Sequence, residues 1–491
     1  MKLTQRFAAI LSAILACLVG GGLLVLPAEN AQALIQSPVP KTGLTYAIPV
    51  NPNIVSNPET NFGAFAWQAF VALNWPADCK GVPLKEKTIG EAPNNPRVWE
   101  FYQFPEDVFT RDGAKPELQP IVPPQCAVSK DNQSVAQDLR LTEFASEPTF
   151  QPDQLELNRK LSILVPGNKP LIDRAGNYIL NEIRMNPVEV NQIVENGWYS
   201  PENLKDFNNE NNLFQLMCSA LQPQGIYPYP PFDRVPCSDN TSMGTIELKA
   251  AWKVLQDPVP DELRSTYYTT TRTFDVQTPD NVNGEKTEVT VPVGLVGFHI
   301  IQKTSQQGWI WATFEHIKNA PDAKNLPESG DYNLYSSDCQ ENCTANKPFA
   351  KKPYLWGKEF PYAVTQTEGG EIVKQIPSQI TRLVSIPDIA QSLNSKWKAK
   401  LAAVPNASVW QNYQLIGVQW LDNPYIPYDL NERRLIPAQL ANVTLEPYVQ
   451  KTELGSSCIA CHTNAWLPSS KVHADFSFLM NNNQSLGSVR K

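Results

Sequence analysis

Clusters of basic residues, internal repeats and heptad patterns are all missing from this sequence of 491 residues. Without a basic cluster, a nucleic acid is not expected as a partner, because phosphate binding requires concentrated positive charge. Without repeats or heptads, solenoid and coiled-coil architectures are excluded. Histidine and methionine are scarce, at four and five residues, so few imidazole or thioether side chains are available to bind a metal ion.

Long apolar stretches are also missing, except at the N-terminus. Lys2 and Arg6 precede an apolar run at residues 7–26, and residues 31–33 (Ala-Gln-Ala) form a small-x-small cleavage site. This pattern predicts a signal peptide over residues 1–33 and a protein exported to the periplasm or an equivalent lumen. The alternative is an uncleaved membrane anchor, because the run is about long enough to span a bilayer. Beyond this segment, no membrane contact is expected.

The segment Cys458-Ile459-Ala460-Cys461-His462 has the C-x-x-C-H spacing of a c-type haem attachment site. Two thiols three positions apart can form thioethers to one porphyrin, and the adjacent imidazole then lies beneath the iron as its proximal ligand. We therefore expect one covalent haem c, with Cys458 and Cys461 as attachment points and His462 as the iron ligand.

Three other interpretations of the motif are weaker. A zinc site needs four ligands, and only His473 lies nearby. A redox-active C-x-x-C needs a strand before it and a helix after it, which the flanking residues do not suggest. A plain disulfide leaves His462 unexplained. An exported chain agrees with the haem interpretation, because haem is attached to reduced cysteines outside the cytoplasm.

Six further cysteines belong to the exported part of the chain. An oxidising compartment would pair them, and we expect nearest neighbours to join, because each such pair brackets a loop rich in Pro, Asn, Asp or Gln. Free buried thiols are the alternative. The expected disulfides are Cys79–Cys126, Cys218–Cys237 and Cys339–Cys343.

Apolar periodicity and abundant proline, 43 residues, predict a loop-rich α+β fold with a central antiparallel β-sheet and peripheral helices. Helices are expected at 61–75 and 97–104, with short ones opening at Pro187 and Pro201. Strands are expected at 246–252, 270–276, 287–293, 294–304, 309–316 and 409–420, and a hairpin at 171–180. The predicted organisation is a signal peptide (1–33), an extended N-terminal arm (34–60), an α+β globular region (61–450) and a C-terminal haem-attachment segment (451–491).

Only 29 residues follow His462, so the upstream region must complete the haem pocket. Met480 is the candidate distal ligand, because on a strand Phe476, Phe478 and Met480 would share one face and cover a porphyrin. The alternative is an apolar strip packed on the core. His473 is either close enough to fold back or an exposed surface histidine. An open distal position would instead admit O₂ or peroxide.

A second group of candidates lies upstream. The two strands at 294–304 and 309–316 place His299 and His316 within two residues of register, and Glu315 adjoins His316. Together they would form a distal pocket, with an imidazole to hydrogen-bond a ligand and a carboxylate to move protons. The alternative is that His299 is a core histidine with satisfied nitrogens.

The motif and the leader together resemble the exported c-type cytochrome family in its broad sense. Segments 67–76 (WQAFVALNWP), 246–252 (IELKAAW), 312–316 (ATFEH) and 440–442 (LAN) further resemble predicted secreted cytochrome-c-like proteins. This resemblance implies that Cys458 and Cys461 hold the haem and that His462 is the axial ligand. It implies no distal residue and no reaction.

The sequence therefore predicts an exported mono-haem protein that transfers electrons to or from a redox partner protein. The alternative is an enzyme, a haem oxidoreductase that acts on peroxide or a small organic substrate, because a pure carrier does not need some 400 residues beyond its haem site. A third class is a scaffold in which the haem is structural. The sequence leaves open whether the protein is an enzyme.

Overall fold

The computed structural model describes residues 43–53, 57–110, 113–127, 164–165, 169–204, 214–218, 243–282, 284, 286–406, 408–422, 434–451, 456–468 and 472–481. Residues 44–491 belong to one compact unit, to which the description below is confined. The predicted signal peptide lies outside the described residues. Within them, no helix combines the length and apolar character needed to cross a bilayer.

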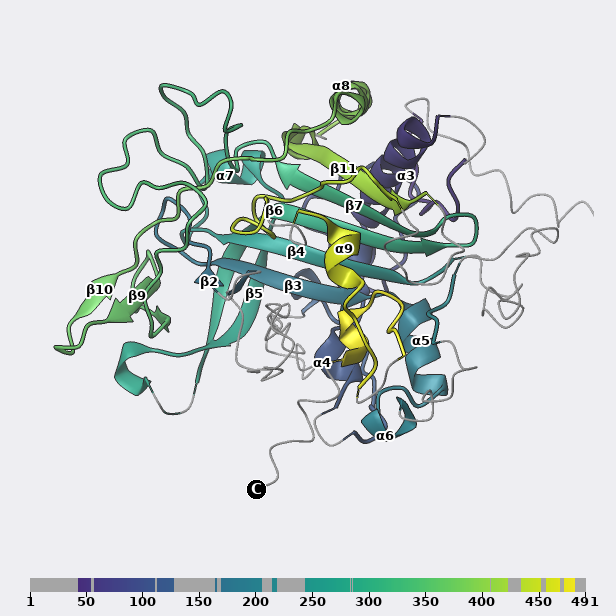
Figure 1. Cartoon of the computed structure of the whole chain (residues 1–491), viewed down its shortest axis with the longest axis horizontal. Helices are drawn as coiled ribbons and strands as arrows, with labels where there is room; N and C mark the ends of the chain where they lie inside the picture. The colour runs from purple at the N-terminus through teal and green to yellow at the C-terminus, as the bar shows by residue number, and fades with distance from the viewer. Residues whose placement is uncertain are drawn as a thin grey trace, which may run out of the picture. The chain divides into compact units, whose positions relative to one another are not determined.

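A seven-stranded antiparallel sheet forms the centre of the described part of this unit, and it confirms the predicted α+β fold (Figure 1). The strand order is β12-β11-β7-β6-β4-β3, and β5 pairs with the first half of β6. The strands are β3 (Ile179–Met185), β4 (Ile246–Val254), β5 (Thr269–Val276), β6 (Thr287–Thr304), β7 (Gly308–His316), β11 (Tyr413–Leu421) and β12 (Leu435–Ile436).

Strand β6 differs from its prediction. The two strands expected at 287–293 and 294–304 are one continuous strand of 18 residues, whose first half pairs with β5 and whose second half pairs with β7. Strand β4 spans the junction, because it pairs with residues 293–302 of β6. The run of β-branched and aromatic residues continues through Pro292 and Gly294 without a turn signal strong enough to end the strand.

One face of the sheet carries two long helices. Side chains alternate along β7, so Ala312 and Phe314 point to this face, where Trp67 and Phe70 of α3 (Pro58–Leu73) lie with ring centroids 5.0 and 4.4 Å from that of Phe314. Helix α8 (Asp388–Ala402) packs on α3 through a stacked pair of tryptophans, Trp67 and Trp397. The predicted helix at 61–75 is thus α3, which begins three residues earlier and ends two residues earlier.

The opposite face carries a second core cluster, to which residues from the start, the middle and the end of the described chain contribute. Figure 1 shows α9 (Cys458–His462), in yellow, in front of the strands, with α5 (Pro187–Glu195) below and beside the sheet. The C-terminal residues buried in this cluster are Ile459, Ala465, Leu467, Ala474, Phe476, Leu479 and Met480. The segment that bears the motif is therefore part of the core of this unit.

The remaining elements are short, as the proline content predicted. The helices are η1 (Val98–Phe101), α4 (Pro105–Val108), η2 (Pro124–Cys126), α6 (Pro201–Leu204), α7 (Asp261–Thr266), η5 (Pro279–Asn281), η6 (Ser408–Asn412) and η7 (Phe478–Asn481). The strands are β1 (Leu164–Val165), β2 (Lys169–Pro170), β8 (Leu355–Trp356), β9 (Ala363–Gln366) and β10 (Ile372–Lys374). The helix expected at 97–104 is mostly η1, and the hairpin at 171–180 is reduced to one bridge between Ile172 and Tyr178.

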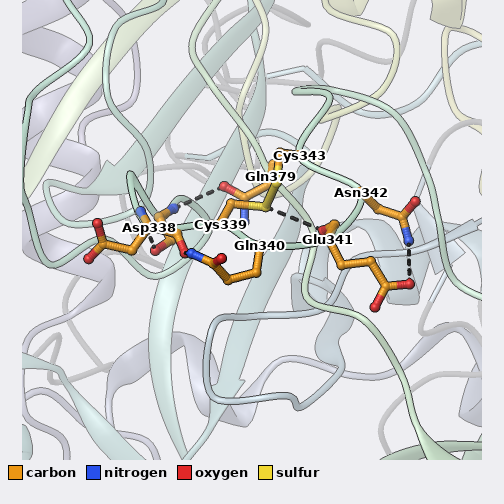
Figure 2. Close-up of a disulfide and its surroundings, with 8 residues drawn as sticks. Asp338, Cys339, Gln340, Glu341, Asn342, Cys343 and Gln379 are labelled. Carbon is orange, nitrogen blue, oxygen red and sulfur yellow. Dashed lines mark hydrogen bonds between the residues drawn. A yellow bond between two sulfur atoms is a disulfide. The ribbon is translucent and has the colours of Figure 1, made fainter.

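The structure contains two of the three predicted disulfides, Cys79–Cys126 and Cys339–Cys343. Cys218 is disulfide-bonded as well, whereas its expected partner Cys237 lies outside the described residues. Figure 2 shows the Cys339–Cys343 loop, in which the Cys339 sulfur lies 3.3 Å from the carbonyl oxygen of Glu341.

The N-terminal arm predicted at 34–60 is described from residue 43 to residue 53 and again from residue 57. It is not a detached tail, because Leu44 is buried in the core and the Pro49 carbonyl accepts a 2.7 Å hydrogen bond from Gln302 of β6.

Candidate functional site

The C-x-x-C-H motif forms the single helical turn α9, and two contacts fix where this turn begins. The Ser457 hydroxyl caps it by accepting a hydrogen bond from the Ala460 amide at 3.1 Å. The Gln419 side-chain oxygen on β11 accepts hydrogen bonds from the Ser457 hydroxyl at 3.1 Å and from the Ile459 amide at 2.9 Å. Strand β11 therefore sets the position of the motif on the sheet.

Within this turn the two cysteines lie three positions apart, on one side of the helix. Both are partly exposed and their sulfur atoms are not joined to each other, while Ile459 between them is buried. The helix thus turns its apolar side to the core and both thiols to the same side. That is the arrangement required for two thioether bonds to one macrocycle.

The His462 imidazole is held in a single orientation. Its Nδ1 atom lies 2.7 Å from the carbonyl oxygen of Phe476. A carbonyl only accepts hydrogen bonds, so Nδ1 carries a proton, and in the neutral imidazole the lone pair is then on Nε2. The ring packs against Trp311 of β7 and against Phe478, with centroid distances of 4.4 and 4.7 Å. Metal-binding histidines are oriented in this way, by a hydrogen bond from the nitrogen that does not bind the metal.

The carbonyl that orients His462 belongs to an unusual turn. Asp475 and Phe476 have φ angles of +52° and +67°, a left-handed conformation that costs free energy, above all for a bulky residue such as phenylalanine. Asp475 is 3% exposed and anchors the turn: its carboxylate accepts hydrogen bonds from the Leu216 amide at 2.8 Å and from Trp309 Nε1 at 3.2 Å. It also forms an ion pair with Lys303 of β6.

His473 lies in the same segment and is buried, so it is not the exposed histidine that the sequence allowed. Its Nε2 donates a 2.9 Å hydrogen bond to the carbonyl oxygen of Thr463, and its ring contacts those of Trp466 and Phe476. The prediction that His473 lies close in space to the motif is correct, because Thr463 directly follows His462. These contacts give it a role in closing the loop between α9 and the turn at Asp475.

Met480 is fully buried in the second core cluster. The strand expected over Phe476, Phe478 and Met480 is wrong, because residues 478–481 form the 3₁₀ helix η7 and Phe476 is left-handed. The prediction that these three residues share one face of a strand is therefore wrong.

The structure separates His316 from the other two candidates, His299 and Glu315, which share one face of the sheet. His299 pairs across the sheet with Thr313, which is three residues before His316. The sequence had predicted a separation of at most two residues. Because side chains alternate along β7, His316 points to the face opposite that of Trp311. There its Nε2 donates to the Thr266 carbonyl oxygen at 3.1 Å, and its Nδ1 accepts from the Lys318 amide at 3.1 Å.

His316 and Glu315 have structural partners that account for their burial. Burial lowers the pKa of His316 to about 3, and so this imidazole is neutral. Glu315 forms a bidentate ion pair with Arg382 and accepts a 2.8 Å hydrogen bond from the Val443 amide. His299 lies on the same face as Trp311, with its Nε2 3.5 Å from the Glu446 carboxylate.

The residues that organise the motif from a distance were not found from the sequence. Lys303, Asp475 and Gln419 come from three separate elements, and no spacing links them. One signal was present: Lys303 follows an apolar run in a strand expected to be central, and a charge in that position requires a partner.

Comparison with models of known protein families, with curated proteins and with solved structures yields no match for this chain. Among the residues that the structure describes, no three His, Cys, Asp or Glu side chains are grouped so as to hold a metal ion. Any functional assignment therefore depends on the local chemistry of α9 and its surroundings.

Proposed function

We propose that this protein is an exported c-type cytochrome-like protein that binds one haem covalently through Cys458 and Cys461 and transfers electrons. The main support for this proposal is the 2.7 Å contact between His462 Nδ1 and the Phe476 carbonyl oxygen. Because Nδ1 is used in this contact, Nε2 is the nitrogen that can bind iron. A histidine in a plain disulfide motif has no need of such an arrangement.

The surroundings of the motif also fit a haem. Both thiols lie on one side of α9 and are partly exposed, and the imidazole rests on the aromatic ring of Trp311. The bound haem would supply an iron centre that cycles between two oxidation states, with a potential set by its axial ligands and the surrounding dielectric. The residues of the chain would hold the macrocycle, orient the imidazole through the Phe476 carbonyl and exclude water from that side.

Export is supported by the cysteines outside the motif. Disulfides persist in oxidising compartments and are rare in the cytosol, and the chain contains Cys79–Cys126 and Cys339–Cys343. The proposed location is the periplasm or an equivalent lumen, where thioether attachment also takes place. A redox partner protein is the proposed electron donor or acceptor.

The test is retention of haem after denaturation. Mature protein from an exporting host that matures c-type haem should give a haem-stained band on a denaturing gel, and the C458S/C461S variant should give none. The C339S/C343S variant is the matched control: it removes two cysteines of similar spacing, and it should keep the stain. A colourless wild-type preparation, or one that binds zinc at the motif, refutes the proposal.

Carbon monoxide separates electron transfer from the alternative of a haem oxidoreductase. Addition to the reduced protein should leave the absorption spectrum unchanged if the distal position is closed by a protein ligand. A rapid spectral change means an accessible iron, and it would favour the enzyme.

A further inference from the structure

Two glutamates lie side by side beneath the C-terminal segment. Glu189 on α5 is 0% exposed and Glu247 on β4 is 5% exposed. Asn186, which caps α5, brings their elements together: its side chain donates to the Gly244 carbonyl oxygen at 2.8 Å, and its amide donates to the Ile246 carbonyl oxygen at 3.0 Å. The two carboxyl groups lie close enough for the negative charge of Glu247 to raise the pKa of Glu189.

No cation compensates this pair. Among the described residues, neither Glu189 nor Glu247 forms an ion pair, and no amide or side-chain N–H donates to either oxygen of Glu189. Lys303 faces the pair from β6, but its ammonium group is occupied by Asp475 and by the Leu216 carbonyl oxygen at 2.8 Å.

The same side of the sheet carries further charged and titratable groups, among them Glu315, which is paired with Arg382, and His299, which lies beside Glu446. Lys249 lies two residues from Glu247 on the same face of β4, where it pairs across the sheet with His299. Asp475 faces the pair from the C-terminal segment and, being negative, disfavours ionisation of either glutamate. On β3, the residues paired with Glu247 and Lys249 are Met185 and Ile183, which carry no charge.

Two adjacent buried carboxyl groups cannot both be ionised, so the pair must hold at least one proton at neutral pH. Burial is the main cause that raises the pKa of each: that of Glu189 lies well above its ordinary value, and that of Glu247 rises to about 7. The second proton of the pair is therefore gained or lost near neutral pH.

The pair is connected to the turn that holds His462. Ser477 is 1% exposed and hydrogen-bonds to the Glu247 carboxyl group. It directly follows Phe476, whose carbonyl oxygen accepts a hydrogen bond from His462 Nδ1. Across the sheet, Glu247 pairs with Ile301, and Ile301 pairs with Trp311, whose ring packs on His462. Strands β4 and β7 are separated by β6, so two inter-strand distances place Glu247 about 10 Å from Trp311.

We infer that the Glu189–Glu247 pair takes up one proton when the haem held by His462 gains one electron, so that this protein couples electron transfer to proton uptake. The inference rests on the proposed function. The electron comes from a one-electron donor protein and the proton from water. The added negative charge at the iron is balanced when the Glu247 carboxylate becomes a carboxylic acid. On oxidation the same O–H bond breaks and the proton returns to solvent.

The experiment is a redox titration of the haem-loaded protein at a series of pH values around 7. For wild type, the potential should fall as the pH rises, by at most about 59 mV per pH unit, the limit at which one proton per electron changes the ratio of reduced to oxidised protein tenfold per unit. The Glu247→Gln and Glu189→Gln variants should lose most of this slope. Glu371→Gln, which removes an exposed carboxylate from the β9–β10 turn, should keep it.

A second measurement reports the protonation of the carboxyl groups directly. The infrared difference spectrum of reduced minus oxidised wild type should contain a carboxylic acid C=O band, and Glu247→Gln should lack it. A flat pH profile in a haem-loaded wild type overturns proton coupling and leaves the proposed function standing. So does a slope that survives in both glutamine variants. A protein without haem overturns both.

Discussion

Replacement of Lys303 by methionine tests whether the ion pair with Asp475 holds the C-terminal segment on the sheet. Lys303 is 5% exposed. Its ammonium group contacts the Asp475 carboxylate, the Leu216 carbonyl oxygen and the Gln215 side chain. Methionine keeps most of the apolar stem. It removes the charge, which lies 5.7 Å from the centroid of the Trp309 ring.

The variant should lose stability because it leaves the Asp475 carboxylate buried without its cation. Asp475 stays buried, with the Leu216 amide and Trp309 Nε1 as hydrogen-bond donors but no opposite charge. Breaking a buried ion pair from one side costs about 3–5 kcal/mol, and the free energy of unfolding of Lys303→Met should fall by that amount. The pKa of Lys303 is lowered by burial, which Asp475 opposes, so neither charge is well solvated without the other.

The assay is urea unfolding of the variant beside two others. Lys358→Met breaks an ion pair with Asp280 whose side chains are 75% and 67% exposed, and it should cost less than about 1 kcal/mol. Adding Asp475→Asn to Lys303→Met should recover part of the loss, because the unpaired charge is removed and asparagine tolerates a left-handed backbone. A loss below about 1 kcal/mol for Lys303→Met, equal to that of Lys358→Met, would refute the reasoning.

Two further predictions concern stability. His316 has a pKa lowered to about 3, below the 6.5 of an unfolded histidine, so the unfolded chain binds more protons between these values and stability should fall as pH drops from 6.5 towards 3. The full effect is roughly 4–5 kcal/mol; His316→Gln should unfold with a shallower pH dependence in this range, and an unchanged profile contradicts the assignment. Removal of Cys79–Cys126, which are 47 residues apart, should cost about 4 kcal/mol in urea unfolding, against about 2 kcal/mol for Cys339–Cys343, which are 4 residues apart. Equal losses would show that loop closure does not govern these crosslinks.

The fold was predictable where one signal dominated. Alternation located β4, the turn residues at 305–308 indicated where β7 begins, and the helical spacing before Pro76 placed the ends of α3 within three residues. The register of β7 was harder, because it depends on the conformation of the turn before Gly308, and a one-residue error moves a side chain to the other face. That error is the reason why His316 was grouped with His299.

The candidate site was predictable only at its covalent centre. The spacing of Cys458, Cys461 and His462 is local, and so a single sequence reveals it. The conformation of Phe476 is not local: a left-handed phenylalanine is unfavourable by itself and is maintained by contacts of Asp475 with residues more than 150 positions away. No propensity of the segment encodes those contacts.

The second core cluster has a consequence for the order of events during synthesis. Its C-terminal members lie between Ile459 and Met480, whereas Val108 and Met185 of the same cluster leave the ribosome hundreds of residues earlier. Translation proceeds at about 5–20 residues per second. The apolar surface around Met185 therefore stays without these C-terminal partners for at least tens of seconds after its synthesis.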